Sequence, residues 1–374
     1  MIKNSQSNPS PTPLPDTKCL NALRFFAMCI IAFFWHYQHF GVYYVEDIRS
    51  VFEWSYFNGW LMVDLFFTLS GFGMYLGYAS KVHNHTISFK EYIFKRILKL
   101  YPLFIFTLFL VTILEFWHKY LCGYTFVYGY FDLRHFLMNI ILCQNGIFGT
   151  EQSFNGPSWC ISVLFILYIL FYVVVRSAQK RSTLLLLFGV LFLLGLFIIV
   201  LKIDYPFLLN DHFARGLASF SLGVLTAYIY KTNTIRKKRL IGYCCLMIIL
   251  VYYCVSRFEL VRINYFYLYY LMMVSPAIIF ATIYITEVNR CFSTTVMQYL
   301  GSISLPLYLL HFPIQCCIRD VDLTLHLNVD YNSLFSLILY FFVSVLLCAA
   351  YQRYLSKPFD RVYLSLYSKL IKKD

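Results

Sequence analysis

The residues best suited to chemistry lie in one apolar stretch near the start of the chain. Leu23–Phe40 (LRFFAMCIIAFFWHYQHF) opens on Arg24 and closes on His36 and His39. Ionisable groups inside a membrane-spanning helix are costly, so they usually mark a site. A buried arginine stays charged and offers planar donors for phosphate oxygens, whereas a histidine exchanges a proton near neutral pH. The stretch therefore predicts an anionic ligand at its first end and proton transfer towards its second.

Each of these residues also has a purely structural interpretation. Arg24 could be an interfacial anchor whose charged head reaches the membrane surface, and His36 could be a hydrogen-bonded core histidine. His36 and His39 are three residues apart, a spacing that can place two metal ligands on one helical face. No third ligand with matching geometry is evident, so no metal is expected.

Further candidates lie in the next two apolar stretches. Asp64 is a second intramembrane ionisable group, and Ser70 is followed by Gly71, a small pair that lets a helix or a ligand approach closely. Arg96 and Lys99 lie at the start of the third stretch, one helical turn apart. Two cations on one face could hold a phosphate.

The elements that must position these residues are membrane helices. The chain has 374 residues, of which 60% are hydrophobic and only 13% charged, whereas an ordinary soluble domain has about 25% charged residues. Because about 20 apolar residues cross a bilayer, we predict an all-α polytopic bundle of about ten transmembrane helices. They are expected near 20–40, 57–79, 98–118, 158–176, 183–201, 213–230, 239–256, 265–286, 297–317 and 333–354.

Orientation follows from lysine and arginine, which gather in every second loop. Cytoplasmic loops carry the excess of these residues, so both termini are expected inside, in the inner or plasma membrane. The same distribution explains the net charge of +13 without nucleic acid. We expect a disordered tail at 1–17, a membrane domain at 18–356 and a basic cytoplasmic tail at 357–374.

Two other features fall outside the expected spans. Leu133–Phe148 is short and interrupted by polar residues, so we interpret it as a loop or a re-entrant piece on the outer side. Cys122 and Cys143 share that outer loop and could form a disulfide. The remaining cysteines lie mainly within spans, where they behave as small apolar residues.

The chain resembles a known family, the integral-membrane acyltransferases of type three, whose bacterial members O-acylate cell-surface glycans. Five sequence blocks carry the resemblance, in the family's order, over most of the chain. They are Leu23-Arg24 with His36, Phe66–Phe72 (FFTLSGF), Arg96–Pro102 (RILKLYP), Arg215-Gly216 with Phe220 and Gly223, and Leu300–His311 (LGSISLPLYLLH).

The resemblance implies acyl-coenzyme A as the donor, most simply acetyl-coenzyme A, bound from the cytoplasm. It implies that Arg24 contacts the coenzyme's anionic groups, with Arg96, Lys99 and Ser70 nearby. It also implies that His36 is the general base on an acceptor hydroxyl, supported by His311. The acceptor would be a sugar of a surface or lipid-linked glycan, and membrane lipids would surround the protein. The identity of the acceptor glycan, the position of its acylated hydroxyl, the length of the acyl chain and a homo-oligomeric state stay open.

Three departures from the family pattern matter. Eleven residues separate Arg24 from His36 where the family commonly has ten, which on an ideal helix leaves the two roughly 120° apart. A π-bulge would absorb the extra residue. Leu164 stands where many members carry a glutamate, and Asp64 or Glu115 could replace that acid. Lys99 stands where a second arginine is common, which keeps the charge but loses the bidentate fork.

Two other classes of function remain open from the sequence. A transporter or flippase could use Arg24, Asp64, His36 and His311 as a coupling path, although no repeated half with paired broken helices is visible. A non-catalytic scaffold or sensor could have kept the fold. We expect the enzyme, with direct transfer preferred and an acyl-histidine intermediate at His36 as the alternative.

Overall fold

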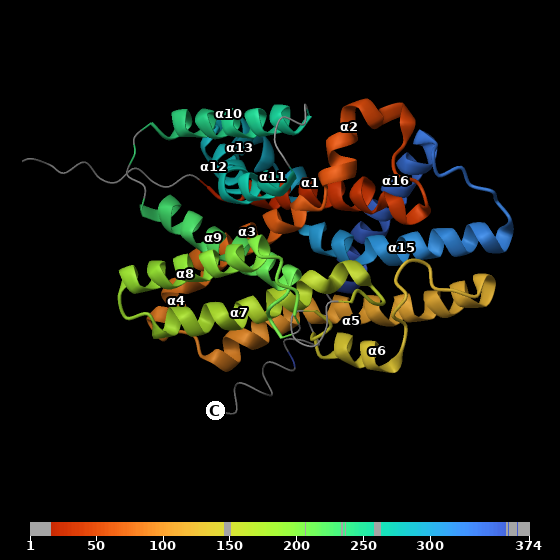
Figure 1. The fold of residues 1–374 in the computed structure, drawn as a ribbon, viewed down its shortest axis with the longest axis horizontal. Helices are drawn as coiled ribbons and strands as arrows, with labels where there is room; N and C mark the ends of the chain where they lie inside the picture. Colours follow the sequence, from red (N-terminus) through yellow and green to blue (C-terminus); the bar gives the residue numbers. More distant parts are fainter. Residues whose placement is uncertain are drawn as a thin grey trace, which may run out of the picture.

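The chain is described here from a computed structural model. The structure describes residues 16–145, 151–205, 207–232, 235, 237–257, 263–356, 358 and 365. Nearly all of both expected tails, and the end of the expected outer segment at 133–148, lie outside these residues. Within them the chain is helical and contains no strand beyond isolated bridges (Figure 1).

The first half of the chain supplies the helices that surround the candidate residues. The elements are α1 (Cys19–Phe33), the 3₁₀ helix η1 (Trp35–Phe40), α2 (Glu46–Asn58), α3 (Leu61–Met74), the π-helix η2 (Tyr75–Ala79), α4 (Ser80–His83), α5 (Phe89–Cys122), α6 (Leu133–Ile140), the 3₁₀ turn η3 (Gly156–Ser158), α7 (Trp159–Ser177) and α8 (Arg181–Val200).

The second half closes the bundle. Its elements are α9 (Asp211–Thr232), α10 (Lys238–Arg257), α11 (Ile263–Tyr269), the π-helix η4 (Tyr270–Val274), α12 (Ser275–Tyr284), α13 (Thr286–Phe292), α14 (Thr295–Ser302), α15 (Ser304–Leu325), α16 (Leu334–Ala350) and the π-helix η5 (Tyr351–Leu355).

The number of candidate membrane spans agrees roughly with the expected ten. Eight helical segments of the described chain are long and apolar enough to cross a membrane. A ninth span arises if α14 and α15, which meet at a bend of 49°, cross together. The expected span at 213–230 corresponds to α9, which is not among them. It carries Arg215 and two serines, Ser219 and Ser221, on a helix that packs closely against α3 and α8.

The described part of the segment expected on the outer side, residues 133–145, contains only one short helix. α6 has eight residues, too few to cross a bilayer. Cys122 and Cys143, the pair considered for a disulfide, are both free thiols.

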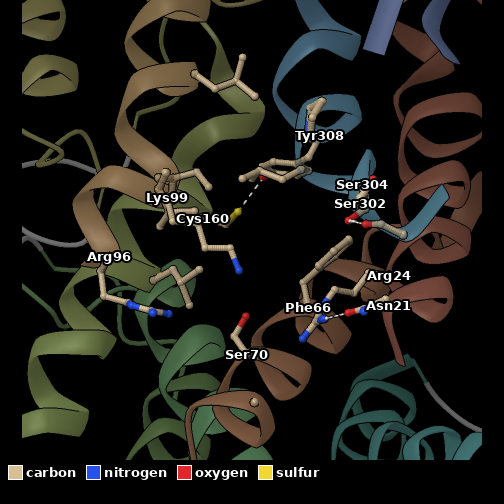
Figure 2. A pocket seen from close by; sticks show the side chains of 18 of the residues that line it. Asn21, Arg24, Phe66, Ser70, Arg96, Lys99, Cys160, Ser302, Ser304 and Tyr308 are labelled. Carbon is tan, nitrogen blue, oxygen red and sulfur yellow. Dashed lines mark hydrogen bonds between the residues drawn. The ribbon is translucent and has the colours of Figure 1, made fainter. Parts of the chain in front are cut away.

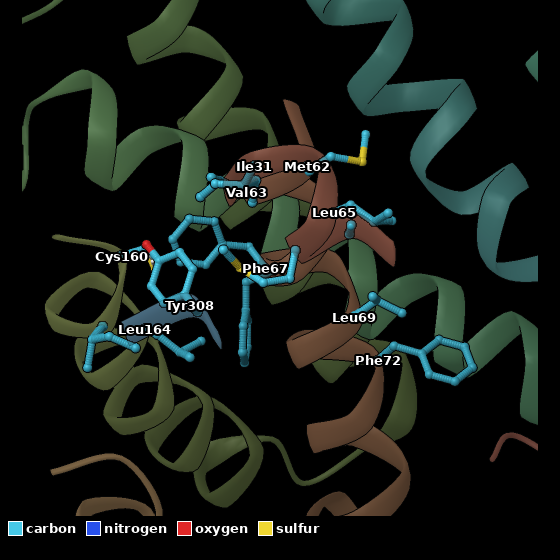
Figure 3. Close-up of a cluster of buried hydrophobic side chains, with 14 of the residues drawn as sticks. Ile31, Met62, Val63, Leu65, Phe67, Leu69, Phe72, Cys160, Leu164 and Tyr308 are labelled. Atoms are coloured by element: carbon cyan, nitrogen blue, oxygen red, sulfur yellow. Dashed lines mark hydrogen bonds between the residues drawn. The ribbon is translucent and has the colours of Figure 1, made fainter. Parts of the chain in front are cut away.

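The core is centred on α3, and its closest neighbour is α9. A side-chain carbon at Gly71 would lie 2.0 Å from the carbonyl oxygen of Phe220. One at Gly223 would lie 2.0 Å from the carbonyl oxygen of Thr68. Glycine is therefore needed at both positions for the backbones to approach this closely. Around this contact α3 buries apolar side chains such as Phe67, Leu69 and Phe72 (Figure 3).

The first helix is interrupted between its two candidate residues. α1 ends at Phe33, and Phe34 has φ −123° and ψ −65°, outside the helical region. The chain then continues as the 3₁₀ helix η1, which carries His36 and His39. The extra residue is absorbed without a π-bulge in α1, because a break and a change of helix type separate Arg24 from His36. The ideal-helix angle between Arg24 and His36 therefore does not apply.

Candidate active site

A cavity of about 730 Å³ lies among α1, α3, α5, α7, α14, α15 and η5. This volume is within the usual range of ligand sites, about 300–1,000 Å³. Arg24, Ser70, Arg96 and Lys99 all line it, so four of the residues predicted for coenzyme binding meet in one place (Figure 2). They come from three different helices, α1, α3 and α5.

The cavity is cationic, because its described lining contains these three positive side chains and no carboxylate. Arg24 is held by Asn21, whose Oδ1 accepts from its Nη1 at 2.8 Å, and Asn21 in turn donates to Gln298 at 2.9 Å. Figure 2 shows the amine of Lys99 pointing into the same space as the guanidinium of Arg24. Uncompensated cations inside a membrane protein favour an anionic ligand.

Arg96 is oriented by an aromatic side chain. Its Nη2 donates to the hydroxyl of Tyr78, and its guanidinium carbon lies 4.3 Å from the centre of the Tyr78 ring. Cation–π contact and the hydrogen bond together fix the side chain without neutralising it. The charge therefore stays available to a ligand.

Tyr308 and Cys160 close one part of the cavity wall. The Cys160 thiol donates to the Tyr308 hydroxyl at 2.8 Å, and that hydroxyl donates to the carbonyl of Pro157. Leu164, which stands where the family often has glutamate, lines the cavity as well. At that position the cavity wall is therefore apolar.

The ring of Tyr308 lies 6.1 Å from that of His311, which belongs to a pair of histidines. Nδ1 of His36 is 2.8 Å from Nε2 of His311, and the two ring planes differ by only 3°. His311 is fully buried, whereas His36 is half-buried. The two predicted catalytic histidines, 275 residues apart in sequence, are thus in direct contact.

The hydrogen bonds around this pair assign the ring protons. Nδ1 of His311 lies 2.7 Å from the carbonyl oxygen of Tyr308. A carbonyl can only accept, so in the neutral ring this nitrogen carries the proton and Nε2 of His311 is an acceptor. Nδ1 of His36 must then donate to it. The lone pair of His36 is left on Nε2, where it can act as a base.

A second set of contacts holds the backbone at His36. Gln315 donates from Nε2 to the carbonyl of His36 at 2.9 Å. Its Oε1 accepts from Nδ1 of His39 at 2.9 Å. The position of His39 is thus explained by its contact with Gln315, and no group of three or more candidate ligands for a metal occurs in the described chain.

α15 is kept in place beside these histidines by a side chain from outside the helix. Pro313 has no N–H, so the carbonyl of Leu309 lacks its usual helical donor. Nδ2 of Asn155, which precedes η3, donates to that carbonyl at 2.9 Å. The proline thus creates an attachment point close to His311.

A comparison with protein families now identifies the chain. A family model described as an acyltransferase domain matches residues 17–353. The chain belongs to the acyltransferase type three family. A membrane acyltransferase is therefore supported by both the match and the apolar helices. No curated protein and no solved structure matches the chain.

Asp64 of this acyltransferase, predicted as a catalytic residue, lies in a different environment from the pair formed by His36 and His311. Its carboxylate is fully buried and receives two bonds from Arg215, at 2.8 Å from Nη2 and 3.3 Å from Nε. Ser219 and Tyr267 also donate to it, at 3.3 and 3.2 Å. No contact joins Asp64 to His36 among the described residues. Its catalytic role stays a prediction, whereas its contacts form a clamp between α3 and α9.

Glu115 is the other acid considered for the missing glutamate. Its Oε2 accepts from the backbone N–H of Phe126 at 3.1 Å, near the end of α5. It is nearly fully buried, and its described hydrogen bonds do not reach the histidine pair. In this chain the partner of His36 is therefore His311, with no carboxylate among their described contacts.

Tyr308 and Gln315 are the site residues that sequence reasoning did not single out. They lie three residues before and four residues after His311 on α15. Positions three and four apart share a helical face. The pattern Tyr-x-x-His-x-x-x-Gln was therefore the signal that could have revealed them.

Proposed function

We propose that this acyltransferase moves an acyl group, most simply acetyl, from cytoplasmic acyl-coenzyme A to a sugar hydroxyl at the outer face. The acceptor is a cell-surface or lipid-linked glycan. The observation that carries the proposal is a chain of contacts through Tyr308. Tyr308 lines the cationic cavity, its carbonyl accepts from His311, and His311 accepts from His36, which leaves Nε2 of His36 free to act as the base.

The charge of the cavity supports this donor. Coenzyme A carries several phosphates, and arginine is well suited to bind phosphate in a bidentate manner. Arg24, Arg96 and Lys99 bind these groups, and Ser70 lies beside them in the lining. The thioester then extends towards Tyr308 and Cys160 in the cavity wall, where the Tyr308 ring lies 6.1 Å from the ring of His311.

The transfer step needs one base. Nε2 of His36 takes the proton of the acceptor hydroxyl while its oxygen attacks the thioester carbonyl. The new C–O bond forms, the C–S bond breaks, and the thiolate of coenzyme A leaves and takes up the proton that Nε2 of His36 had accepted. A positioned base contributes about 10²–10⁴-fold to such a reaction. The hydrogen bond from Nδ1 of His36 to His311 stabilises the imidazolium that forms.

The test separates donor binding from chemistry. Wild type, Arg24→Ala, His36→Ala and the control Arg176→Ala are purified in nanodiscs, and their folding is checked by size-exclusion profile. Arg176 is an exposed arginine outside the cavity lining. Acetyl-coenzyme A binding is measured by calorimetry and thiol release by a colour reagent.

We expect Arg24→Ala to bind acetyl-coenzyme A about tenfold more weakly or worse, since it loses charge-assisted hydrogen bonds. His36→Ala should bind normally but release thiol about 10²–10⁴-fold more slowly. Arg176→Ala should behave as wild type. A folded wild type that neither binds nor hydrolyses acyl-coenzyme A would refute the proposed donor.

A further inference from the structure

A second cavity, of about 280 Å³, lies away from the candidate active site and shares no lining residue with it. It is bounded by η2 and α4, by the turn between α7 and α8, and by the end of α9. Figure 1 shows α4 beside α7 and α8. Tyr75, Val175 and Ala178 are buried and form an apolar floor.

The rim of this cavity is cationic. Lys180 and Arg181 come from the α7–α8 turn, and Lys231 comes from the last turn of α9. All three side chains are exposed. In the described part of the chain, none of them forms an ion pair and no carboxylate lines the cavity.

The positive-inside rule accounts for basic residues in these loops. It does not account for their convergence, because loop charges that only set topology need not surround a common hollow. Here three charges from two separate segments surround one apolar floor. Basic pockets between helices at the cytoplasmic side are the usual recognition sites for phosphate headgroups of anionic lipids.

We propose that this second cavity binds a phosphate group, with Lys180, Arg181 and Lys231 as its cationic ligands. The phosphate comes from an anionic phospholipid of the cytoplasmic leaflet or from a small soluble phosphate. A cavity of about 280 Å³ lies below the usual range for drug-sized ligands. It therefore suits a headgroup or glycerol phosphate. The site does not depend on the acyl transfer proposed above.

The test uses the full chain in nanodiscs of phosphatidylcholine, to which phosphatidylglycerol is added. Lipid retained after release from the disc is counted by native mass spectrometry. The variant Lys180→Gln/Arg181→Gln/Lys231→Gln is compared with wild type. A control, Arg176→Gln/Lys237→Gln/Lys238→Gln, removes the same charge from the last turn of α7 and the start of α10 without touching the cavity lining.

Wild type should retain phosphatidylglycerol in preference to phosphatidylcholine. The loss of each rim cation should weaken this retention about fivefold, whereas the control should match wild type. Glycerol phosphate displaces the lipid if the site is open to soluble phosphate, and fails to displace it if the bilayer supplies the ligand. Either result supports the site.

Equal retention of the two lipids by wild type would overturn the proposal, provided that glycerol phosphate also fails to bind by calorimetry. So would equal retention by the cavity triple variant and wild type. The single variant Arg181→Gln changes one exposed side chain. It keeps the test decisive if the triple variant fails to give a folded size-exclusion profile.

Discussion

At the scale of single residues, His311 determines which ring nitrogen of His36 carries the proton. His311 holds its own proton towards the Tyr308 carbonyl and accepts from Nδ1 of His36. We expect His311→Ala to lower kcat about 10²-fold, towards the lower end of what a general base contributes. The KM for acetyl-coenzyme A should stay unchanged, because His311 does not line the donor cavity. Steady-state kinetics in nanodiscs measures both values.

The conservative variant separates positioning from simple packing. Gln in place of His311 can offer its Oε1 to Nδ1 of His36, so His311→Gln should recover part of the lost kcat. The pH profile of kcat should also differ between the Ala and Gln variants, since only one of them restrains the protonation of His36. Equal kcat and equal pH profiles in the two variants would leave His311 with a packing role alone.

At the scale of elements, the α3–α9 contact depends on glycine. We expect Gly71→Ala to lower the thermal midpoint strongly, because its new carbon would meet the Phe220 carbonyl oxygen at 2.0 Å and the backbones would have to separate. Gly189→Ala on α8 is the matched control, since nothing lies within 4 Å of its new carbon. Alanine there should be neutral or stabilising by up to about 1 kcal/mol. Thermal unfolding in detergent compares the two.

The same pair of helices is joined by the ion pair of Asp64 and Arg215. Removal of one partner of a buried pair typically costs about 3–5 kcal/mol, because the other charge is left without compensation. We expect Asp64→Leu and Arg215→Met each to lower the thermal midpoint. The double variant should be less destabilised than the sum of the two single variants.

Kinetics of the same variants distinguishes a structural clamp from a catalytic acid. If Asp64 acts only as a clamp, the double variant should release thiol at a rate close to wild type at temperatures where it is folded. A loss of kcat comparable to that of His36→Ala, with folding intact, would instead return Asp64 to the catalytic set.

The first helix shows what sequence reasoning could predict about the site and what it could not. The residue types at Arg24 and His36 predicted that both would be functional, but their spacing on an ideal helix placed them on different faces. The helix breaks at Phe34, and the segment after the break is contacted by residues far away in sequence, such as Gln315 donating to the His36 carbonyl. Periodicity along one segment carries no information about such contacts.

At the scale of the whole molecule, hydropathy predicted the class of fold because a bilayer demands about 20 apolar residues per span. Family blocks predicted that Arg24, Ser70, Arg96 and Lys99 belong together, and all four line one cavity. The sequence did not indicate that Asp64 pairs with Arg215, 151 residues away. From the sequence alone, a buried acid that has a charged partner cannot be told apart from one that has none.

The proposed transfer across the bilayer requires a defined orientation. The rim of the second cavity and the N-terminal end of α5 must face the cytoplasm, whereas the α15–α16 connection must face outside. We expect Asn328→Cys in that connection to react with a membrane-impermeant thiol reagent in intact cells. Asn84→Cys, between α4 and α5, should react only after permeabilisation.

Both positions are exposed in the structure, so a difference in reactivity reports sidedness rather than burial. The native free cysteines are first tested for background labelling, because several of them are exposed. The opposite pattern would place Lys180, Arg181 and Lys231 outside, against the positive-inside rule. The cationic donor cavity would then face away from the compartment that holds acyl-coenzyme A, and transfer in the proposed direction would be impossible.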